Sequence, residues 1–266
     1  MIQFEYISKI VDKLLEQEKS FTNIDLIMSG RFCLDWRFNA IEDYQVMRSE
    51  TVFGESQDVV VAIHKHYKGF LGTSNMLLAM RHGVPCKGTM SHQGPMAMQG
   101  VFGIVNANKK WRYYWRLTYG DKLNIFLPDT FTTEVFFRDF TAEEAAQWNL
   151  RQDSGDPHGW TALVIVNYNR LGEPLKNHMM AYSDNLNPEK FNTITNTYRE
   201  LFDVAGGIGT NFSNDCGHPA VSIVIKLSQV NNGDGWVDVV KLSDDGGKHT
   251  GTPEAIAKAK LELDIL

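Results

Sequence analysis

The sequence has few cysteines and no long apolar run. Cys33, Cys86 and Cys216 are odd in number, lie far apart and lack CxxC spacing. This argues against a disulfide framework or a thiolate zinc site and is typical of a reducing compartment. No apolar run approaches the roughly 18 residues that a membrane-spanning helix needs. Residues 1–5 lack the basic and apolar regions of a secretory signal. We therefore expect a cytoplasmic protein with no membrane partner.

An excess of positive charge is also missing. The formal net charge is −6, so we do not expect nucleic acid as a partner. A phosphate ligand is compatible with this charge, because loops and helix N-termini bind anions locally. The chain has 266 residues, of which 43% are hydrophobic and 22% charged. These values predict a folded globular protein with a sizeable core.

Hydrophobic periodicity predicts two helices and a strand in the first quarter of the chain. The expected helices cover residues 7–15 and 57–67, and the expected strand covers residues 24–28. The apolar face predicted for the second helix consists of Val59, Val60, Ile63 and Tyr67. A further helix is expected at residues 76–80, with Ser74 as a candidate N-cap.

From residue 70 onward, short apolar runs alternate with helical segments, a rhythm typical of α/β proteins. A strand at 125–127 is followed by a helix at 141–149 that starts with a capping box, Thr141 with Glu144. Residues 162–169 either continue this helix or form a strand.

The C-terminal part predicts a hairpin and a last helix. The β-rich runs 221–227 and 236–242 are separated by a turn-rich stretch. Thr252 and Pro253 then start a helix that runs to about Leu261. No internal repeat or linker is visible, so a single domain over residues 1–266 is expected.

Small or polar loops follow the apolar runs, where α/β proteins place their sites. Carboxylates in such loops bind Mg²⁺ or ribose hydroxyls, and glycines let backbone N–H groups approach a phosphate. The loops are Gly72-Thr73-Ser74-Asn75, Gly88-Thr89-Met90-Ser91-His92, residues 128–133, Arg151-Gln152-Asp153-Ser154-Gly155-Asp156-Pro157, Tyr182-Ser183-Asp184-Asn185-Leu186 and residues 206–212.

The order of these motifs resembles that of the nicotinate phosphoribosyltransferase family, over residues 70 to about 250. Besides the loops above, the resemblance rests on Arg138-Asp139-Phe140, Ile223-Val224-Ile225-Lys226-Leu227 and Lys241-Leu242-Ser243-Asp244. It implies an irregular α/β barrel of the type II phosphoribosyltransferase kind. It also implies the synthesis of nicotinate mononucleotide and pyrophosphate from nicotinic acid and phosphoribosyl pyrophosphate, with ATP and Mg²⁺, as a step of NAD biosynthesis. The family is usually dimeric, so a homodimer is expected.

The resemblance also implies a set of site residues. Loss of pyrophosphate from the anomeric carbon passes through an oxocarbenium-like state, so the site has to hold ribose, 5′-phosphate and leaving group. The residues expected in catalysis are His92, Asp129, Arg151 and Asp153. Those expected to bind substrate are Ser74, Asp156, Ser183, Asp184, Gly207, Gly209 and Thr210.

Within this set, Asp129 and Asp153 are expected at the ribose hydroxyls and the metal-bound pyrophosphate, with Asp153 and Asp156 as Mg²⁺ ligands. Arg151 lies two residues before Asp153, so on a strand the two side chains share a face. The residues expected to form the 5′-phosphate cradle are Asp184, Gly207, Gly209 and Thr210.

Two residues bear on substrate choice and energy coupling. Ser74 stands where the related nicotinamide-using enzymes carry a carboxylate, which would repel the carboxylate of nicotinic acid. Ser74 therefore favours the acid. His92 matches the histidine that the family phosphorylates from ATP. The other histidines are interpreted as structural.

The sequence departs from the family pattern in three places. The N-terminal portion that precedes the first helix in the family is absent, and with it an aromatic residue that stacks on the pyridine ring. The family's arginine-rich motif is replaced by Met28-Ser29-Gly30-Arg31-Phe32. His92 is followed by Gln93 where the family has an acidic residue. The alternative is therefore a non-catalytic relative, or a subunit of a split enzyme whose second polypeptide supplies the missing portion.

Overall fold

Two separate sheets organise the chain. The structure, a computed structural model, describes residues 32–38, 57–213 and 223–265. Four strands form a parallel sheet in the order of the sequence. They are β2 (Ile125–Phe126), β3 (Asn149–Gln152), β4 (Met179–Tyr182) and β5 (Asp203–Gly206). Three strands form an antiparallel sheet in the order β1-β6-β7. They are β1 (Phe32–Phe38), β6 (Ile223–Asn231) and β7 (Trp236–Asp238).

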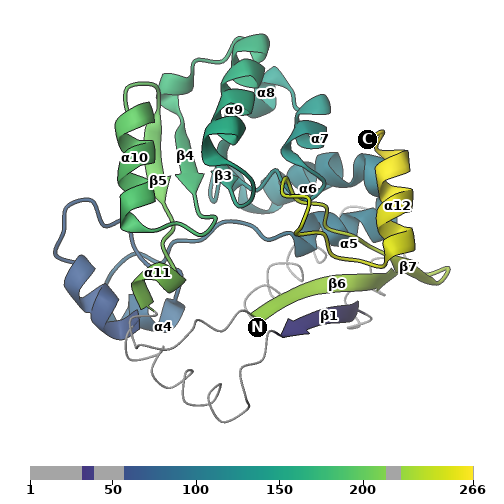
Figure 1. Ribbon diagram of the computed structural model, residues 1–266, viewed down its shortest axis with the longest axis horizontal. Helices are drawn as coiled ribbons and strands as arrows, with labels where there is room; N and C mark the ends of the chain where they lie inside the picture. Colours follow the sequence, from purple (N-terminus) through teal and green to yellow (C-terminus); the bar gives the residue numbers. More distant parts are fainter. Residues whose placement is uncertain (1–31, 39–56, 214–222, 266) are drawn as a thin grey trace.

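Helices alternate with the parallel strands, which confirms the α/β class. Figure 1 shows α9 and α10 beside β3, β4 and β5, while α5, α6 and α12 lie near β6. The helices from α4 to α8 are α4 (Met76–His82), α5 (Gln93–Phe102), α6 (Ile104–Tyr119), α7 (Thr133–Arg138) and α8 (Ala142–Ala145). The others are α9 (Pro157–Leu171), the 3₁₀ turn η1 (Leu175–Asn177), α10 (Pro188–Tyr198), α11 (Thr210–Ser213) and α12 (Pro253–Glu262).

Three of the four parallel strands place a side chain in the centre of the core. Phe126, Leu150 and Met180, one from each of three neighbouring strands, are fully buried. A parallel strand covered on both faces reads as an apolar run, which is why Ile125-Phe126-Leu127 was recognisable in the sequence. The core continues into α6, where the indoles of Trp111 and Trp115 pack together.

The capping residues mark where α8 and α9 begin. The capping box of Thr141 and Glu144 is confirmed, but α8 stops at Ala145 and residues 149–152 form β3. The expected helix over 141–149 is therefore too long. Residues 162–169 neither continue it nor form a strand: they lie within α9, which begins anew at Pro157 after the N-cap Asp156.

The hairpin and the last helix are confirmed. β6 and β7 pair antiparallel, and Oδ1 of Asn232 accepts hydrogen bonds from the N–H groups of Asp234 and Gly235 in the turn. The hydroxyl of Thr252 caps α12 by accepting from the N–H of Ala255.

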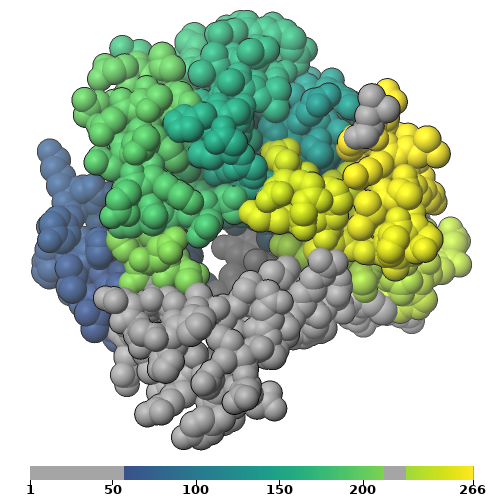
Figure 2. All heavy atoms as spheres, in the orientation of Figure 1, coloured from purple at the N-terminus to yellow at the C-terminus, as the bar shows by residue number. Residues whose placement is uncertain are grey.

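The segment 57–87 forms a lobe at the edge of the fold (Figure 2). Residues 57–64 are helical, as predicted. The predicted apolar face is wrong, however, because Val59, Ile63 and Tyr67 are exposed whereas Val61 is buried. This lobe (blue) lies at the left edge of the molecule in Figure 2, away from the C-terminal segment (yellow). The helix therefore turns a different side toward the protein than its hydrophobic periodicity indicated.

The start of α4 also differs from expectation. Its N-cap is Asn75, whose Oδ1 accepts hydrogen bonds from the N–H groups of Leu77 and Leu78. Ser74 precedes the cap and is exposed. Asparagine and serine are equally good N-cap residues. Asn75 is the cap because it is the residue directly before the first helical residue, Met76.

Three further expectations concern the N-terminal residues, membrane-spanning helices and the number of domains. The predicted helix at 7–15 and strand at 24–28 lie outside the described residues. Within the described part of the chain, no helix has both the length and the apolar character needed to cross a membrane. The single-domain interpretation stays a prediction.

Close packing of α5 depends on two glycines. The α-carbon of Gly94 lies against the indole of Trp111 in α6, and that of Gly100 lies against Val230 in β6. A β-carbon at Gly100 would lie 2.5 Å from the β-carbon of Val230, a residue with no exposed surface. The glycine thus lets α5 pack directly on the antiparallel sheet.

We predict that Gly100→Ala lowers the free energy of unfolding. Alanine favours a helix over glycine by about 1 kcal/mol, but overpacking a closed core costs about 1–3 kcal/mol. We therefore expect a net loss of up to about 2 kcal/mol, measured by urea denaturation. Gly69→Ala is the matched control, because a β-carbon there meets nothing within 4 Å. An equal or higher unfolding free energy for Gly100→Ala would contradict this packing.

Candidate active site

The carboxyl ends of the four parallel strands bring the predicted loops together. Asp129, Asp153, Ser183 and Gly207 each follow one of these strands. The hydroxyl of Ser183 donates to Oδ1 of Asp153 (2.8 Å), and the N–H of Gly207 donates to the carbonyl of Tyr182 (2.8 Å). In open α/β sheets this edge is where ligands bind. These hydrogen bonds join neighbouring loops at the same edge of the sheet.

At the centre of this edge lies a buried contact between a histidine and a carboxylate. His92 stands at the start of α5 and Asp129 follows β2; their side chains are 5% and 1% exposed. Nε2 of His92 lies 2.9 Å from Oδ1 of Asp129 and 3.7 Å from Oδ2 of Asp153. The other oxygen of Asp129 accepts a hydrogen bond from the hydroxyl of Ser154 (2.6 Å).

Two lysines from the C-terminal part complete the contact. Nζ of Lys226, on β6, lies 3.2 Å from Nδ1 of His92. Nζ of Lys241 lies 3.3 Å from Oδ2 of Asp129. The sequence analysis gave neither lysine a role. A signal was present, because each stands within a run of valine, isoleucine and leucine, and a lysine in a buried strand needs a partner.

Burial and these partners set the protonation states. Burial lowers the pKa of His92, and the ammonium groups of Lys226 and Lys241 lower it further, against the opposing effect of Asp129. Burial alone would raise the pKa of Asp129, but His92, Lys241 and Ser154 bring it well below its ordinary value. Burial, assisted by Lys241, lowers the pKa of Lys226 to about 8. At neutral pH the site therefore holds a neutral imidazole between a carboxylate and an ammonium group.

The hydrogen-bond network assigns the tautomer of His92. An ammonium group can only donate, so Nδ1, which faces Lys226, is the acceptor. Nε2 then carries the proton and donates it to Asp129. The lone pair on Nδ1 is consequently the one available for chemistry.

Beside the histidine, Arg151 and Asp153 lie on one side of β3, as their spacing predicted. Nη2 of Arg151 lies 3.5 Å from Oδ1 of Asp153, and its Nη1 donates to the hydroxyl of Thr89. Thr89 belongs to the loop that leads to His92. Arg151 thus links the loop that leads to His92 with the loop that contains Asp153, and it places a positive charge beside Asp153.

The charges favour an anionic ligand. Nitrogen and oxygen atoms of His92, Asp129 and Asp153 lie within 4.8 Å of one another, close enough to hold a metal ion. Two cations, however, already pair with these carboxylates: Lys241 with Asp129 and Arg151 with Asp153. Mg²⁺ usually takes one or two protein carboxylates and completes its shell with water and substrate phosphates. Asp153 fits that role as a single ligand.

Asp156, the second expected Mg²⁺ ligand, lies elsewhere. It is exposed and caps α9, with its Oδ2 2.6 Å from the N–H of Gly159. It is not part of the group formed by His92, Asp129 and Asp153. Its proposed contact with a metal or substrate stays a prediction.

The expected phosphate cradle contains an ion pair. Asp184, after β4, accepts two hydrogen bonds from Nζ of Lys248 (2.8 and 3.0 Å). The amide of Asn211 donates to the carbonyl of Leu186 (3.0 Å), which ties the loop after β5 to the loop after β4. Gly207, Gly209 and Thr210 are exposed on this loop. Lys248 is a third lysine, after Lys226 and Lys241, to which the sequence analysis gave no role.

Ser74 does not belong to the hydrogen-bonded group described above. It is exposed on the lobe of residues 57–87, before α4. Its predicted contact with the base is therefore untested by the geometry.

Comparison with known proteins gives a consistent result. The model of the nicotinate phosphoribosyltransferase (NAPRTase) family matches residues 47–265. The chain is 40% identical over 212 residues to a nicotinate phosphoribosyltransferase of Chromohalobacter salexigens, covering 78% of this chain and 54% of that protein. It is 37% identical to one of Saccharomyces cerevisiae, covering 73% of this chain and 47% of the relative. The chain thus spans about half the length of these curated relatives.

Solved structures agree. A nicotinate phosphoribosyltransferase from Porphyromonas gingivalis superposes with a TM-score of 0.75 at 30% identity, covering 91% of this chain and 68% of the other. One from Vibrio cholerae gives a TM-score of 0.75 at 26% identity, covering 80% and 53%. From the match over residues 47–265 and the shared fold, the chain belongs to the nicotinate phosphoribosyltransferase family.

Proposed function

We propose that the chain carries the catalytic part of a nicotinate phosphoribosyltransferase. The proposed reaction joins nicotinic acid to phosphoribosyl pyrophosphate, releases pyrophosphate and is coupled to ATP hydrolysis. The observation that carries the proposal is the buried neutral His92 between Asp129 and Lys226, at the sheet edge where the substrate loops meet. The proposed setting is NAD biosynthesis in the cytoplasm, in a homodimer.

Phosphoryl transfer to His92 accounts for the coupling. In the proposed step the lone pair on Nδ1 attacks the γ-phosphorus of ATP, a new N–P bond forms, and the bond to the β-phosphate oxygen breaks to release ADP. The proton on Nε2 stays in place and is held by Asp129. The ammonium group of Lys226 moves from the nitrogen lone pair to the new phosphoryl oxygens, whose charge it balances.

The transfer to nicotinic acid uses the neighbouring residues. Arg151 and Lys241 supply positive charge for the pyrophosphate leaving group, and Asp153 contacts the ribose hydroxyls. The exposed backbone around Gly207 and Gly209, with Thr210, binds the 5′-phosphate. Asp153 would hold Mg²⁺, which would supply further positive charge for the leaving group. These contacts hold the anomeric carbon in line with the pyridine nitrogen.

A second candidate follows from a departure from the family pattern. With Gln93 next to His92 where the family has an acidic residue, the chain can act as a non-catalytic relative that binds phosphoribosyl pyrophosphate or as the subunit of a split enzyme. Such a relative keeps the ligand site without forming product. A ligand present at a hundred times its dissociation constant would then stabilise the fold by about 2.7 kcal/mol.

Nucleotide formation from each base tests the proposed reaction. We expect the chain to use nicotinic acid in preference to nicotinamide, and Ser74→Asp to reverse the preference by placing two carboxylates together. Ser74→Asn, which adds similar bulk without charge, is the control. Equal use of both bases by the unaltered chain would show that Ser74 is misassigned. If no nucleotide forms but phosphoribosyl pyrophosphate with Mg²⁺ raises Tm, the non-catalytic reading holds.

Removal of the imidazole tests the coupling. We expect His92→Ala to form nucleotide at the rate seen without ATP and to lose ATP stimulation, because alanine has no nitrogen that accepts a phosphoryl group. The measurement is nucleotide formation with and without ATP, together with incorporation of the labelled γ-phosphate. His66→Ala is the matched control, since His66 is exposed on the lobe of residues 57–87. Continued ATP stimulation of His92→Ala would rule out this role.

The charge of Lys226 predicts a pH dependence. Its lowered pKa of about 8 means that the ammonium group is present below pH 8 and is lost as the pH rises through that value. ATP-stimulated activity should therefore fall above about pH 8. Lys226→Arg keeps its charge at all accessible pH values, so it should remove this decline even if its maximal rate is lower. An alkaline limb that is the same in both proteins would contradict this assignment.

A further inference from the structure

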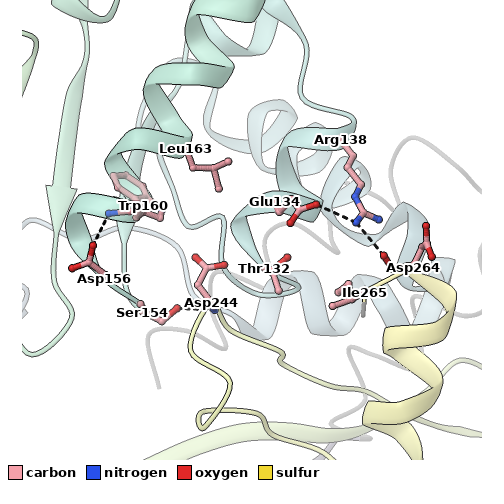
Figure 3. Close-up of a pocket in the computed structure, with 12 residues that line it drawn as sticks. Thr132, Glu134, Arg138, Ser154, Asp156, Trp160, Leu163, Asp244, Asp264 and Ile265 are labelled. Carbon is pink, nitrogen blue, oxygen red and sulfur yellow. Dashed lines mark hydrogen bonds and ion pairs between the residues drawn. The ribbon is translucent and has the colours of Figure 1, made fainter.

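Ser154 lies between the proposed catalytic carboxylate and a loop from the C-terminal part of the chain. Its side chain is fully buried. Its Oγ lies 2.6 Å from Oδ2 of Asp129 and 3.1 Å from the backbone N of Asp244. Figure 3 shows Ser154 and Asp244 side by side at one end of the cavity that it draws.

These two contacts fix the direction of the hydroxyl proton. A backbone N–H can only donate, so the oxygen of Ser154 accepts from Asp244. The hydroxyl hydrogen is then directed to Asp129, which accepts it. With Lys241 on the same oxygen, Oδ2 of Asp129 faces donors on two sides, and Oδ1 is left turned to His92.

The position of Ser154 is determined from several directions. The amide of Gln152 donates to the carbonyls of Ser154 and Gly155 (both 2.9 Å). Gly155 has a φ of +76°, where glycine carries no steric cost, and it packs against Asp244. The hydroxyl therefore has little freedom to turn away from Asp129.

Asp244 links the same point to the loop that contains Asp129. Its two carboxylate oxygens accept from the N–H (2.6 Å) and the hydroxyl (2.5 Å) of Thr133, the first residue of α7. In addition, the N–H of Leu242 donates to the carbonyl of Thr130 (2.7 Å). The segment after β7 is thus attached to the β2–α7 loop on both sides of Phe131, which has no exposed surface.

We propose that Ser154 is a positioning residue that fixes the Asp129 carboxylate, so that its Oδ1 holds the Nε2 proton of His92 and keeps Nδ1 directed toward the phosphoryl donor. The inference rests on the proposed function. Ser154 does not touch the reacting atoms. It acts through Asp129, and Asp244 sets the direction in which its hydroxyl donates.

A water molecule is a poor substitute for the hydroxyl of Ser154. Ser154 and Asp244 are among the residues that line a cavity of about 560 Å³. A water molecule that took the place of the hydroxyl would rotate and would have no fixed donor direction.

The test compares Ser154→Ala with Ser154→Thr, which retains the hydroxyl. Thr197→Ala is the matched control, because it removes a hydroxyl from the exposed face of α10. The spectroscopic readout is the Nε2–H proton of His92 in the full chain labelled with nitrogen-15, assigned by its loss in His92→Ala. In the unaltered protein we expect a slowly exchanging proton shifted downfield by the carboxylate. In Ser154→Ala it should move upfield and exchange faster, and Ser154→Thr should restore it.

The kinetic readout is the split between kcat and KM. Ser154→Ala should lower the ATP-stimulated kcat on the order of tenfold, because a small misplacement of a reacting group is costly. KM for both substrates should stay unchanged. An unaltered Nε2–H resonance in Ser154→Ala, or a threonine variant that resembles the alanine variant, would overturn the proposal. The resonance is read without substrate, so an inactive chain would refute the proposed function and leave this test intact.

Discussion

The contact between His92 and Asp129 is the interaction on which the rest of the site depends. Two buried side chains of this kind are costly unless every polar atom has a partner. Lys226 contacts Nδ1 of the histidine, and Lys241 and Ser154 contact the second oxygen of the aspartate. The partners come from the antiparallel sheet, from the segment after it and from the parallel sheet. Much of the fold beyond the parallel strands can be understood as the support of this one contact.

Three aspartates that the sequence analysis treated alike have different surroundings in the structure. Asp129 is buried among donors, Asp156 is exposed as a helix cap, and Asp184 forms an ion pair with Lys248. All three lie in polar loops that follow apolar runs in the sequence. What differs is the charge that faces each carboxylate, and this charge comes from segments far along the chain. The environment of each loop carboxylate is therefore determined by the donor that the tertiary structure places next to it.

The sequence predicted the features that depend on neighbouring residues. The capping box at Thr141, the hairpin around Asn232 and the caps of α12 involve contacts within a few positions. The placement of polar loops at the ends of the strands followed from the α/β rhythm. The sequence did not reveal which side of the helix at 57–64 is buried, because Val59 and Ile63 repeat at helical spacing but are both exposed. Nor did it reveal the lysine partners of the site, since their pairing depends on how the two sheets pack.

The separation of Lys226 from His92 by 134 residues along the chain has a consequence for how the molecule folds. Contacts between distant residues require a large loop to close and form slowly compared with local ones. During synthesis all four parallel strands and Asp129 leave the ribosome before β6 does. The carboxylate therefore has a hydrated, unburied state for as long as its ammonium partners are missing. Final burial of this strand edge has to wait for the antiparallel hairpin of β6 and β7, so this hairpin completes the surroundings of Asp129.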